Sequence, residues 1–327
     1  MSRRFVNSLQ DGETLDEVFL LADRQLRANR NGDLYLLAQL CDRTGTVSGL
    51  LWNVEEDSVS HINQGDYVRI RGKVQLFQGN LQVILTHINA ISSQGIDLEN
   101  FVPKPTEKTT EHFQRLTEIL LNLENPELRG LMECFLQDEE VKQGLIYAPA
   151  GIRLHHAFHG GLLEHILNLS ETALRIVDLY PKVDFDLLLA GIFMHDLGKL
   201  RELSFETSFS YTDEGQLIGH LVIGVEMLNE KIAEYENKTG QEFPRETKLR
   251  LKHMILSHHG SYEHGTARLP MTPEAIALHH LDNLDAKTNE YMSLIESDPN
   301  SGSNWTPYQS NMQRKLYKGG LDSTDFD

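Results

Sequence analysis

The spacing of apolar residues changes near residue 100, and this change constrains the fold of the 327-residue chain more than any other feature. Before it, short apolar runs are separated by glycine, asparagine and aspartate turns, a pattern that is typical of half-buried strands. From Glu111 onward, apolar residues recur at intervals of three and four, as they do on amphipathic helices. The sequence therefore predicts a multidomain protein, with an all-β domain followed by an all-α domain.

The first region contains five strand-like runs, at 17–22, 33–40, 45–52, 67–76 and 81–85. A helical stretch near residues 54–61 separates the third run from the fourth. Five short strands with this helix between them predict a small closed barrel of the OB type over residues 1–92. Residues 93–110, with Pro103, Pro105 and several threonines, are expected to form a linker.

The second region, residues 111–297, is expected to form an all-α helical bundle. The predicted helices lie at 116–123, 130–136, 162–179, 185–197, 220–236, 247–258 and 273–295. Residues 298–327 are polar and rich in glycine and serine, so they predict a weakly ordered C-terminal tail.

Composition excludes several classes of protein. Hydrophobic residues make up 40% of the chain and charged residues 24%, which fits a soluble globular protein. No apolar run approaches the roughly 20 residues that span a bilayer, and Cys41 and Cys134 are isolated. We therefore expect a cytoplasmic protein with no membrane partner; a homo-oligomer is compatible with the sequence. The net charge of −18 argues against a broadly basic protein that coats nucleic acid, although local binding stays open.

Seven candidate metal ligands follow one another along the helical region. They are His165, His195, Asp196, His220, His258, His259 and Asp282. Imidazole and carboxylate groups are the usual protein ligands of divalent metals. The five predicted helices from residue 162 onward each carry one or two of these residues within or at the end of the helix, which is how a helical bundle builds a buried centre from distant positions. If the residues converge, the chain has a metal-dependent hydrolytic centre.

The order of these ligands resembles the HD-domain superfamily of metal-dependent phosphohydrolases, and Gly198-Lys199 follows the His-Asp pair as it does there. Three longer strings are similar to the YhaM-type 3′-5′ exoribonucleases. They are Gly160-Gly-Leu-Leu-Glu-His165, Leu256-Ser-His-His-Gly260 and His280-Leu-Asp-Asn-Leu-Asp-Ala-Lys287. That family also has an amino-terminal OB domain, in which a strand is comparable to Gly45-Thr-Val-Ser-Gly-Leu-Leu-Trp-Asn53 here.

The resemblance implies two metal positions. His165, His195, Asp196 and Asp282 would hold one divalent ion; His220, His258 and His259 would add a second, with Asp196 bridging both. Two cations about 3.5–4 Å apart suit phosphodiester hydrolysis. Nitrogen and oxygen ligands without thiolate favour Mn²⁺ first, with Mg²⁺, Co²⁺ or Fe as alternatives. Whether His259 is a ligand stays open, because adjacent helical residues diverge by about 100°.

Two further residues are candidates for catalysis beside Asp196. Lys199 lies one turn beyond the His-Asp pair, where it can hold a phosphate oxygen or serve only as a charge at a helix end. His156 precedes the first ligand in a loop that forms either a substrate-facing wall or an ordinary polar connection.

The predicted barrel carries rings and basic groups of the kind that bind single strands. We take Arg43, Trp52, Arg69, Arg71 and Lys73 as candidate nucleic-acid-binding residues. Alternation along residues 67–73 places the last three of these on one face of a strand. The alternative is that the arginines are ordinary solvated residues and that Trp52 belongs to the core.

The function expected from the resemblance and the barrel is a 3′-5′ exoribonuclease acting on single-stranded RNA, with DNA as a second candidate substrate, and releasing nucleoside monophosphates. One alternative is an HD hydrolase of nucleotides or cyclic nucleotides. The other is a non-catalytic nucleic-acid-binding accessory protein with a vestigial hydrolase domain.

Overall fold

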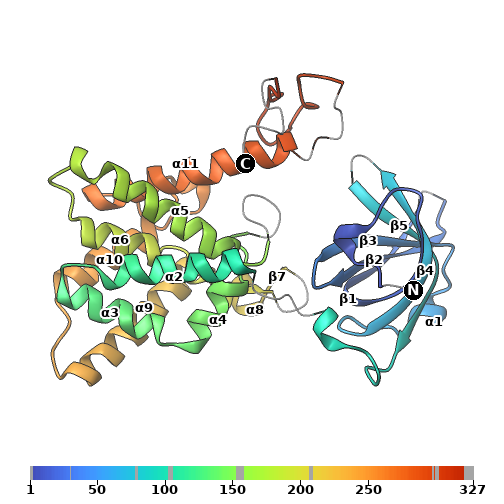
Figure 1. The fold of residues 1–327 in the computed structure, drawn as a ribbon, viewed down its shortest axis with the longest axis horizontal. Coiled ribbons are helices and arrows are strands. Elements are labelled where there is room, and N and C mark those ends of the chain that lie inside the picture. Colours follow the sequence, from blue (N-terminus) through green and yellow to red (C-terminus); the bar gives the residue numbers. More distant parts are fainter. Residues whose placement is uncertain are drawn as a thin grey trace. The chain divides into compact units, whose positions relative to one another are not determined.

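The computed structural model describes residues 3–29, 31–77, 80–101, 106–151, 158–205, 209–296, 298 and 302–319. The chain divides into two compact units, a β unit and a helical unit, which meet in sequence at residues 104 and 105 (Figure 1). The predicted fold class is confirmed in both units.

The β unit is a closed five-stranded barrel. Its strands are β1 (Thr14–Ala28), β2 (Leu34–Asp42), β3 (Gly45–Trp52), β4 (Tyr67–Phe77) and β5 (Asn80–Ile91), joined around the barrel in the order β1-β2-β3-β5-β4. Helix α1 (Glu56–Val59) lies between β3 and β4 in sequence, and β3 pairs with β5 in parallel. This is the topology of an OB-fold, a five-stranded Greek-key barrel.

The interior of the barrel is filled by the inward-facing side of each strand. On β4, buried Val68, Ile70 and Val74 alternate with exposed Arg69 and Arg71. Side chains on a strand point alternately to its two faces, so this alternation places the apolar residues inside and the charged ones outside. Short 3-10 helices, η1 (Val6–Ser8) and η2 (Leu98–Asn100), flank the barrel in sequence.

The helical unit begins earlier than the sequence suggested. Helix α2 spans Glu107–Leu121, so its first turn occupies the end of the segment that was expected to be a linker. Thr106 caps this helix, because its Oγ1 accepts a hydrogen bond from the Thr109 backbone N–H at 3.1 Å. Threonines that the sequence suggests as linker residues therefore start a helix.

The remaining elements of the helical unit are mostly helices. They are α3 (Pro126–Leu136), α4 (Glu139–Tyr147), α5 (Gly161–Ile176), η3 (Val177–Leu179), α6 (Phe185–Met194), α7 (Lys199–Glu202), β6 (Leu203–Ser204), β7 (Ser210–Tyr211), α8 (Asp213–Leu217), α9 (His220–Thr239), α10 (Arg245–Ser257), η4 (Tyr262–His264) and α11 (Pro273–Glu296). The sequence did not predict α4, α7, α8 or the small β6–β7 hairpin.

Helix α6 forms the centre of this unit. Residues 187–194 are all buried, and α6 packs against α3, α5, α10 and α11. Asp184 caps its start, where Oδ1 accepts a hydrogen bond from the Leu187 backbone N–H at 3.1 Å. A helix that is apolar on every side belongs in the interior, and here it carries the His195-Asp196 pair at its end. None of the helices in the described part of the chain is long and apolar enough to cross a membrane.

Candidate metal centre

Three of the predicted ligands meet beside the end of α6. His165 projects from the second turn of α5, His195 is the C-cap residue of α6, and Asp282 lies in the middle of α11. The Nε2 atom of His165 lies 3.3 Å from His195 Nε2 and 3.3 Å from Asp282 Oδ1. Both imidazoles are fully buried. These three residues form the first cluster.

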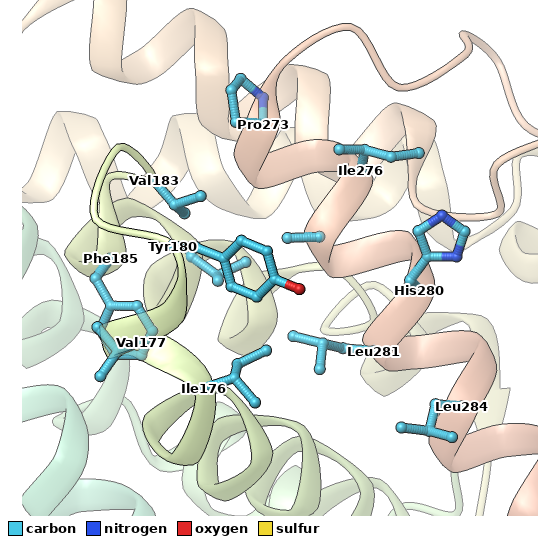
Figure 2. A pocket seen from close by; sticks show the side chains of 12 residues that line it. Ile176, Val177, Tyr180, Val183, Phe185, Pro273, Ile276, His280, Leu281 and Leu284 are labelled. Atoms are coloured by element: carbon cyan, nitrogen blue, oxygen red, sulfur yellow. The ribbon is translucent and has the colours of Figure 1, made fainter.

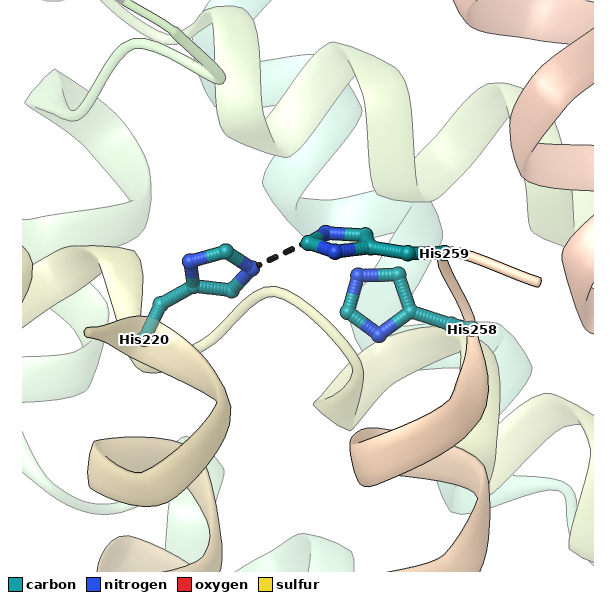
Figure 3. Close-up of side chains that lie close together, drawn as sticks. All are labelled: His220, His258 and His259. Carbon is teal, nitrogen blue, oxygen red and sulfur yellow. Dashed lines mark hydrogen bonds between the residues drawn. The ribbon is translucent and has the colours of Figure 1, made fainter. Parts of the chain in front are cut away.

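A second cluster consists of His220, His258 and His259 (Figure 3). His220 is the first residue of α9, and His258 and His259 follow the last residue of α10. The Nε2 atoms of His220 and His259 lie 3.3 Å apart, and the rings of His258 and His259 lie 4.3 Å apart by their centroids. At the helix end both adjacent histidines turn toward His220, so the structure brings His259 into the cluster.

Asp196 lies between the two clusters and presents one carboxylate oxygen to each. Its Oδ2 is 3.4 Å from His195 Nε2 and 3.9 Å from His165 Nε2. Its Oδ1 is 3.5 Å from His258 Nε2 and 3.6 Å from His220 Nε2. Oδ1 is also buried and accepts no hydrogen bond among the described residues. A carboxylate in this position can bridge two cations.

The donor atoms fit a metal centre in both spacing and protonation. Two neighbouring ligands that bind one cation at about 2.0–2.1 Å lie about 2.8–3.0 Å apart in octahedral and about 3.3–3.4 Å apart in tetrahedral geometry, and the separations found here are 3.3 Å. The Nδ1 atoms of His195 and His258 lie 2.7 and 2.8 Å from the carbonyl oxygens of Ile192 and Ile255. A carbonyl only accepts, so Nδ1 carries the proton and Nε2 offers its lone pair to the cluster.

Each cluster also has one histidine whose Nδ1 contacts a carboxylate. In the first cluster, Asp285 Oδ2 lies 2.7 Å from His165 Nδ1, and Asn168 and Asn289 donate to Asp285 Oδ1. In the second, Glu202 Oε1 lies 3.0 Å from His220 Nδ1. A carboxylate behind a ligating imidazole fixes the ring and raises its basicity. Asp285 belongs to the string His280–Lys287 that is similar to the YhaM-type enzymes, whereas no sequence pattern pointed to Glu202.

Glu202 is positioned by elements that the sequence did not predict. It ends α7, and Thr212 and Gly215 pack against its backbone from the β7–α8 segment. The Thr212 backbone N–H donates to the Glu202 carbonyl at 2.9 Å. A side chain built on Gly215 would overlap this same carbonyl, so glycine is required there.

Burial and charge set the protonation of the centre in the absence of a cation. Burial lowers the pKa of His195 to about 4 and that of His259 to about 3, so both rings are neutral at pH 7. Burial would also lower the pKa of His165, but Asp282 and Asp285 outweigh it and raise that pKa to about 9. Burial opposes ionisation of Asp196, yet Lys199 and the imidazoles hold its pKa well below the usual range.

Lys199 contacts the bridging carboxylate directly. Its Nζ lies 2.6 Å from Asp196 Oδ2, and its side chain is 14% exposed. Burial would lower the pKa of this amine, but Asp196 raises it, so the side chain stays charged. Lys199 is therefore more than a charge at a helix end: it is a buried cation placed at the centre.

Two glycines allow the ligand-bearing segments to approach one another. A side chain on Gly198 would overlap the His220 carbonyl oxygen, so the turn after Asp196 packs directly against the start of α9. Gly260 has a φ of +76°, and a side chain there would overlap the ring of His279. His279 in turn contacts the His258 carbonyl oxygen through Nδ1 at 2.8 Å. Both positions need glycine for the two histidine-bearing ends to meet.

Comparisons with known proteins match both units. Residues 162–287 match the HD domain, and residues 21–91 match the OB-fold nucleic acid binding domain. The 3′-5′ exoribonuclease YhaM of Bacillus subtilis is 34% identical over 87% of this chain and 88% of its own length. The enzymes of the same name from a Geobacillus species and from Listeria monocytogenes are 34% and 33% identical, over 87% and 88% of this chain.

The chain belongs to the YhaM family. This membership confirms the predicted resemblance to YhaM-type proteins. HD domains are metal-dependent phosphohydrolase domains, so the helical unit is a hydrolase that depends on a divalent metal. The matched HD segment contains every one of the seven candidate ligands.

The barrel of this YhaM-family chain exposes one of its candidate rings. Trp52 is 46% exposed, so it is not a core residue, and it lies against Tyr35 on the outer face of β2 and β3 with ring centroids 4.9 Å apart. The OB-fold uses the face formed by strands 2 and 3 to bind oligonucleotides. Arg43 lies at the β2–β3 turn, at the opposite end of this strand pair from Tyr35 and Trp52, with its guanidinium 4.5 Å above the ring of Phe5.

The other three basic candidates lie on β4 and are partly neutralised. Asp16 on β1 accepts from Arg69 Nε at 2.7 Å and from Arg71 Nε at 3.0 Å. Lys73 is exposed and lies opposite Thr14. The three side chains share one outer face, as the alternation predicted, but Asp16 reduces the charge of that face.

His156 falls outside the described residues. A groove of about 390 Å³ lies between η3 and α11 and is lined mainly by apolar side chains such as Tyr180, Ile276 and Leu284 (Figure 2). Its lining includes none of the seven candidate ligands.

Proposed function

We propose that this protein is a metal-dependent 3′-5′ exoribonuclease that shortens single-stranded RNA to nucleoside monophosphates, with single-stranded DNA as a second substrate. Support comes from three YhaM exoribonucleases that each match most of the chain. The observation that carries the proposal is the position of Asp196, whose two oxygens face separate histidine clusters. An OB-fold in the same chain as such a centre favours a strand over a free nucleotide.

In this proposal the centre holds two divalent ions. The first position uses His165, His195, Asp196 and Asp282, and the second uses Asp196, His220, His258 and His259. The nitrogen and oxygen donors suit Mn²⁺, and also Mg²⁺, Co²⁺ or Fe. Bound as a pair, such ions stabilise the charge that develops on a phosphodiester and lower the pKa of a bound water.

The reaction is hydrolysis at the last phosphodiester of the strand. A water oxygen forms a bond to phosphorus, and the bond between phosphorus and the 3′ oxygen of the preceding nucleotide breaks. That 3′ oxygen takes up a proton, and the released product is a nucleoside 5′-monophosphate. Lys199, charged and buried beside Asp196, is positioned to bind a non-bridging phosphate oxygen. His156 remains a candidate for a second phosphate contact.

The barrel is assigned to strand binding. Trp52 supplies a stacking surface, and Arg43, Arg69, Arg71 and Lys73 supply positive charge. The proposed domains are 1–92 for the barrel, 93–110 for the connection, 111–297 for the hydrolase and 298–327 for the tail, and the last residues of the connection form the first turn of α2. An RNA substrate and two buried cysteines that form no disulfide among the described residues fit an enzyme that acts in the cytoplasm, as a monomer or as a homo-oligomer.

The test is a strand-shortening assay with a 5′-labelled 20-nucleotide RNA and a series of divalent metals. We expect a ladder of successively shorter strands with Mn²⁺, release of nucleoside 5′-monophosphates, and no reaction in EDTA. Asp196→Ala should abolish shortening while retaining RNA binding by the barrel. Rapid hydrolysis of mononucleotides without any shortening of the strand would instead identify a nucleotide phosphohydrolase.

A further inference from the structure

The C-terminal segment, residues 302–319, is ordered by antiparallel pairing along its length. The Thr306 backbone N–H donates to the Leu316 carbonyl at 2.9 Å, and the Gln309 backbone N–H donates to the Arg314 carbonyl at 2.8 Å. Thr306 and Leu316 are only 2% and 3% exposed. The polar composition of this region suggested weak order, but pairing across the segment was not visible from composition.

The outward face of the C-terminal segment carries exposed aromatic rings. Trp305 pairs with Tyr317 across the segment, so their side chains lie on the same face, opposite the buried Thr306 and Leu316. The two ring centroids are 5.1 Å apart. Trp305 is 51% exposed, Tyr317 56% and Tyr308 60%. The paired rings of Trp305 and Tyr317, each about half exposed, form a preorganised stacking surface.

The net charge of this segment is positive, whereas that of the whole chain is negative. Residues 302–319 contain Arg314, Lys315 and Lys318 and no acidic residue, whereas the whole chain has a net charge of −18. Arg314 and Lys315 are exposed. Exposed rings interleaved with basic groups bind single-stranded nucleic acid, because every base offers a face for stacking and every phosphate a negative charge.

The segment is attached to the helix that carries a predicted metal ligand. The Asn311 side-chain amide donates to Glu290 Oε1 at 2.9 Å, and Glu290 is 5% exposed near the end of α11 (Figure 1). Glu290 lies eight residues beyond Asp282, which is about 12 Å along a helix. At about 3.4 Å for each stacked nucleotide, a strand must be at least about four nucleotides long to reach from the metal centre to the segment.

We propose that the C-terminal segment is a second binding site for single-stranded RNA, which stacks bases on Trp305 and Tyr317 and neutralises phosphates with Arg314 and Lys315. This inference rests on the proposed exoribonuclease function. The affinity for the substrate then depends on the length of the strand, because only a strand of about four nucleotides or more spans the distance from the metal centre to the C-terminal segment.

Tryptophan fluorescence tests the stacking directly, because the chain has only two tryptophans, Trp52 and Trp305. In full-length Trp52→Phe protein without metal, a 15-nucleotide oligouridylate should quench the remaining fluorescence, and a trinucleotide should not. Binding to the same variant is measured in parallel by anisotropy of the labelled strand. Unchanged Trp305 fluorescence when that binding is saturated would overturn the proposal.

A charge variant tests the phosphate contacts. Each phosphate contact to a single strand contributes about 0.7 to the slope of log affinity against log salt concentration. Arg314→Ala/Lys315→Ala removes two such contacts, so it should make the slope for the 15-mer less steep by about 1.4. The matched control is Lys182→Ala/Arg245→Ala, which removes the same charge at two exposed positions elsewhere in the helical unit. Its slope should stay unchanged. Equal slopes in the two variants would contradict the proposal.

Two further readouts separate the possible outcomes. Turnover of a trinucleotide should be the same in both charge variants and in the natural chain, since so short a strand does not reach the segment. A change of oligomeric state in Arg314→Ala/Lys315→Ala, seen by light scattering, would show that the surface binds a second copy instead of RNA. If the natural chain shortens no RNA, the proposed function itself fails, and this result is distinct from a loss confined to the variants.

Discussion

Asp285 and Glu202 show how single residues can act on each metal position separately. Each carboxylate contacts the Nδ1 atom of one histidine that is a candidate ligand, Asp285 at His165 and Glu202 at His220. The Nδ1 atoms of His195 and His258 instead contact backbone carbonyl oxygens, and a side-chain substitution cannot remove these. The two carboxylates are therefore positioning residues that can be changed one at a time.

We predict that Asp285→Asn weakens metal binding at the first position and Glu202→Gln at the second, each by about 10–100-fold. An amide has no negative charge, so it holds the imidazole less strongly in its ligating form. Calorimetric titration with Mn²⁺ should show one weakened step in each variant, with the other step retained. Asp213→Asn, at an exposed residue of α8, is the control. Equal loss of both steps in each variant would contradict the separate assignment.

The two cysteines give a prediction about pH. Burial raises the pKa of Cys41 to about 12 and also raises that of Cys134. The thiolate is the reactive form, and a raised pKa leaves it scarce until the pH approaches that value. A thiol reagent at pH 8 should therefore modify neither cysteine rapidly in the native protein, and both in urea. Rapid modification of the native chain at pH 8 would contradict the burial of these groups.

At the scale of elements, the metal centre depends on how closely segments meet. Gly198→Ala should destabilise the protein by about 1–3 kcal/mol, because the new methyl group overlaps the His220 carbonyl oxygen and pushes α9 away. It should also weaken the second metal position more than the first. Gly240→Ala is the control, since Gly240 ends α9 with a φ of +68° and open space around it.

Gly240→Ala should cost about 1–2 kcal/mol from its backbone conformation alone and leave metal binding unchanged. Urea unfolding gives the stability of both variants, and Mn²⁺ titration gives the two affinities. If Gly198→Ala bound both ions normally, the turn after Asp196 would not be fixed by its contact with α9.

Sequence patterns predicted the elements well where periodicity was strong. The five strands and the longer helices follow from alternation and from spacings of three and four. The sequence did not predict the first turns of α2 or the short helices α7 and α8. A capping threonine and a helix of four or five residues leave little periodic signal in the sequence. The pairing of Asp16 with Arg69 and Arg71 depends on the register between β1 and β4, which no local pattern specifies.

For the candidate site, the sequence identified residues that could be ligands but not the contacts around them. The resemblance placed His220, His258 and His259 in one group, and the structure brings them together. The roles of Asp285 and Glu202 depend on atomic contacts across 120 and 18 residues of sequence, respectively, so spacing could not reveal them. Whether the seven residues are the ligands remains a prediction that metal binding must test.

At the scale of the whole molecule, metal binding should stabilise only one of the two compact units. A ligand that binds only the folded state at 100 times its Kd adds about 2.7 kcal/mol of stability for each site. Mn²⁺ should therefore raise the Tm of the helical unit, followed by helical circular dichroism. It should leave the unfolding of the barrel unchanged, which Trp52 fluorescence reports in a Trp305→Phe variant.

Asp196→Ala should remove this metal-dependent shift, because it takes the bridging carboxylate from both positions. A shift of equal size in the barrel, or a shift that persists in Asp196→Ala, would contradict a centre confined to the helical unit.

The most direct measurement is anomalous diffraction from crystals of the full chain grown with Mn²⁺. The central claim is that Asp196 bridges two cations held by the two histidine clusters. It predicts two anomalous peaks about 3.5–4 Å apart on either side of the Asp196 carboxylate, one beside His165 and His195 and the other beside His220 and His258. A single peak at saturating Mn²⁺, or two peaks that do not share Asp196, would contradict it.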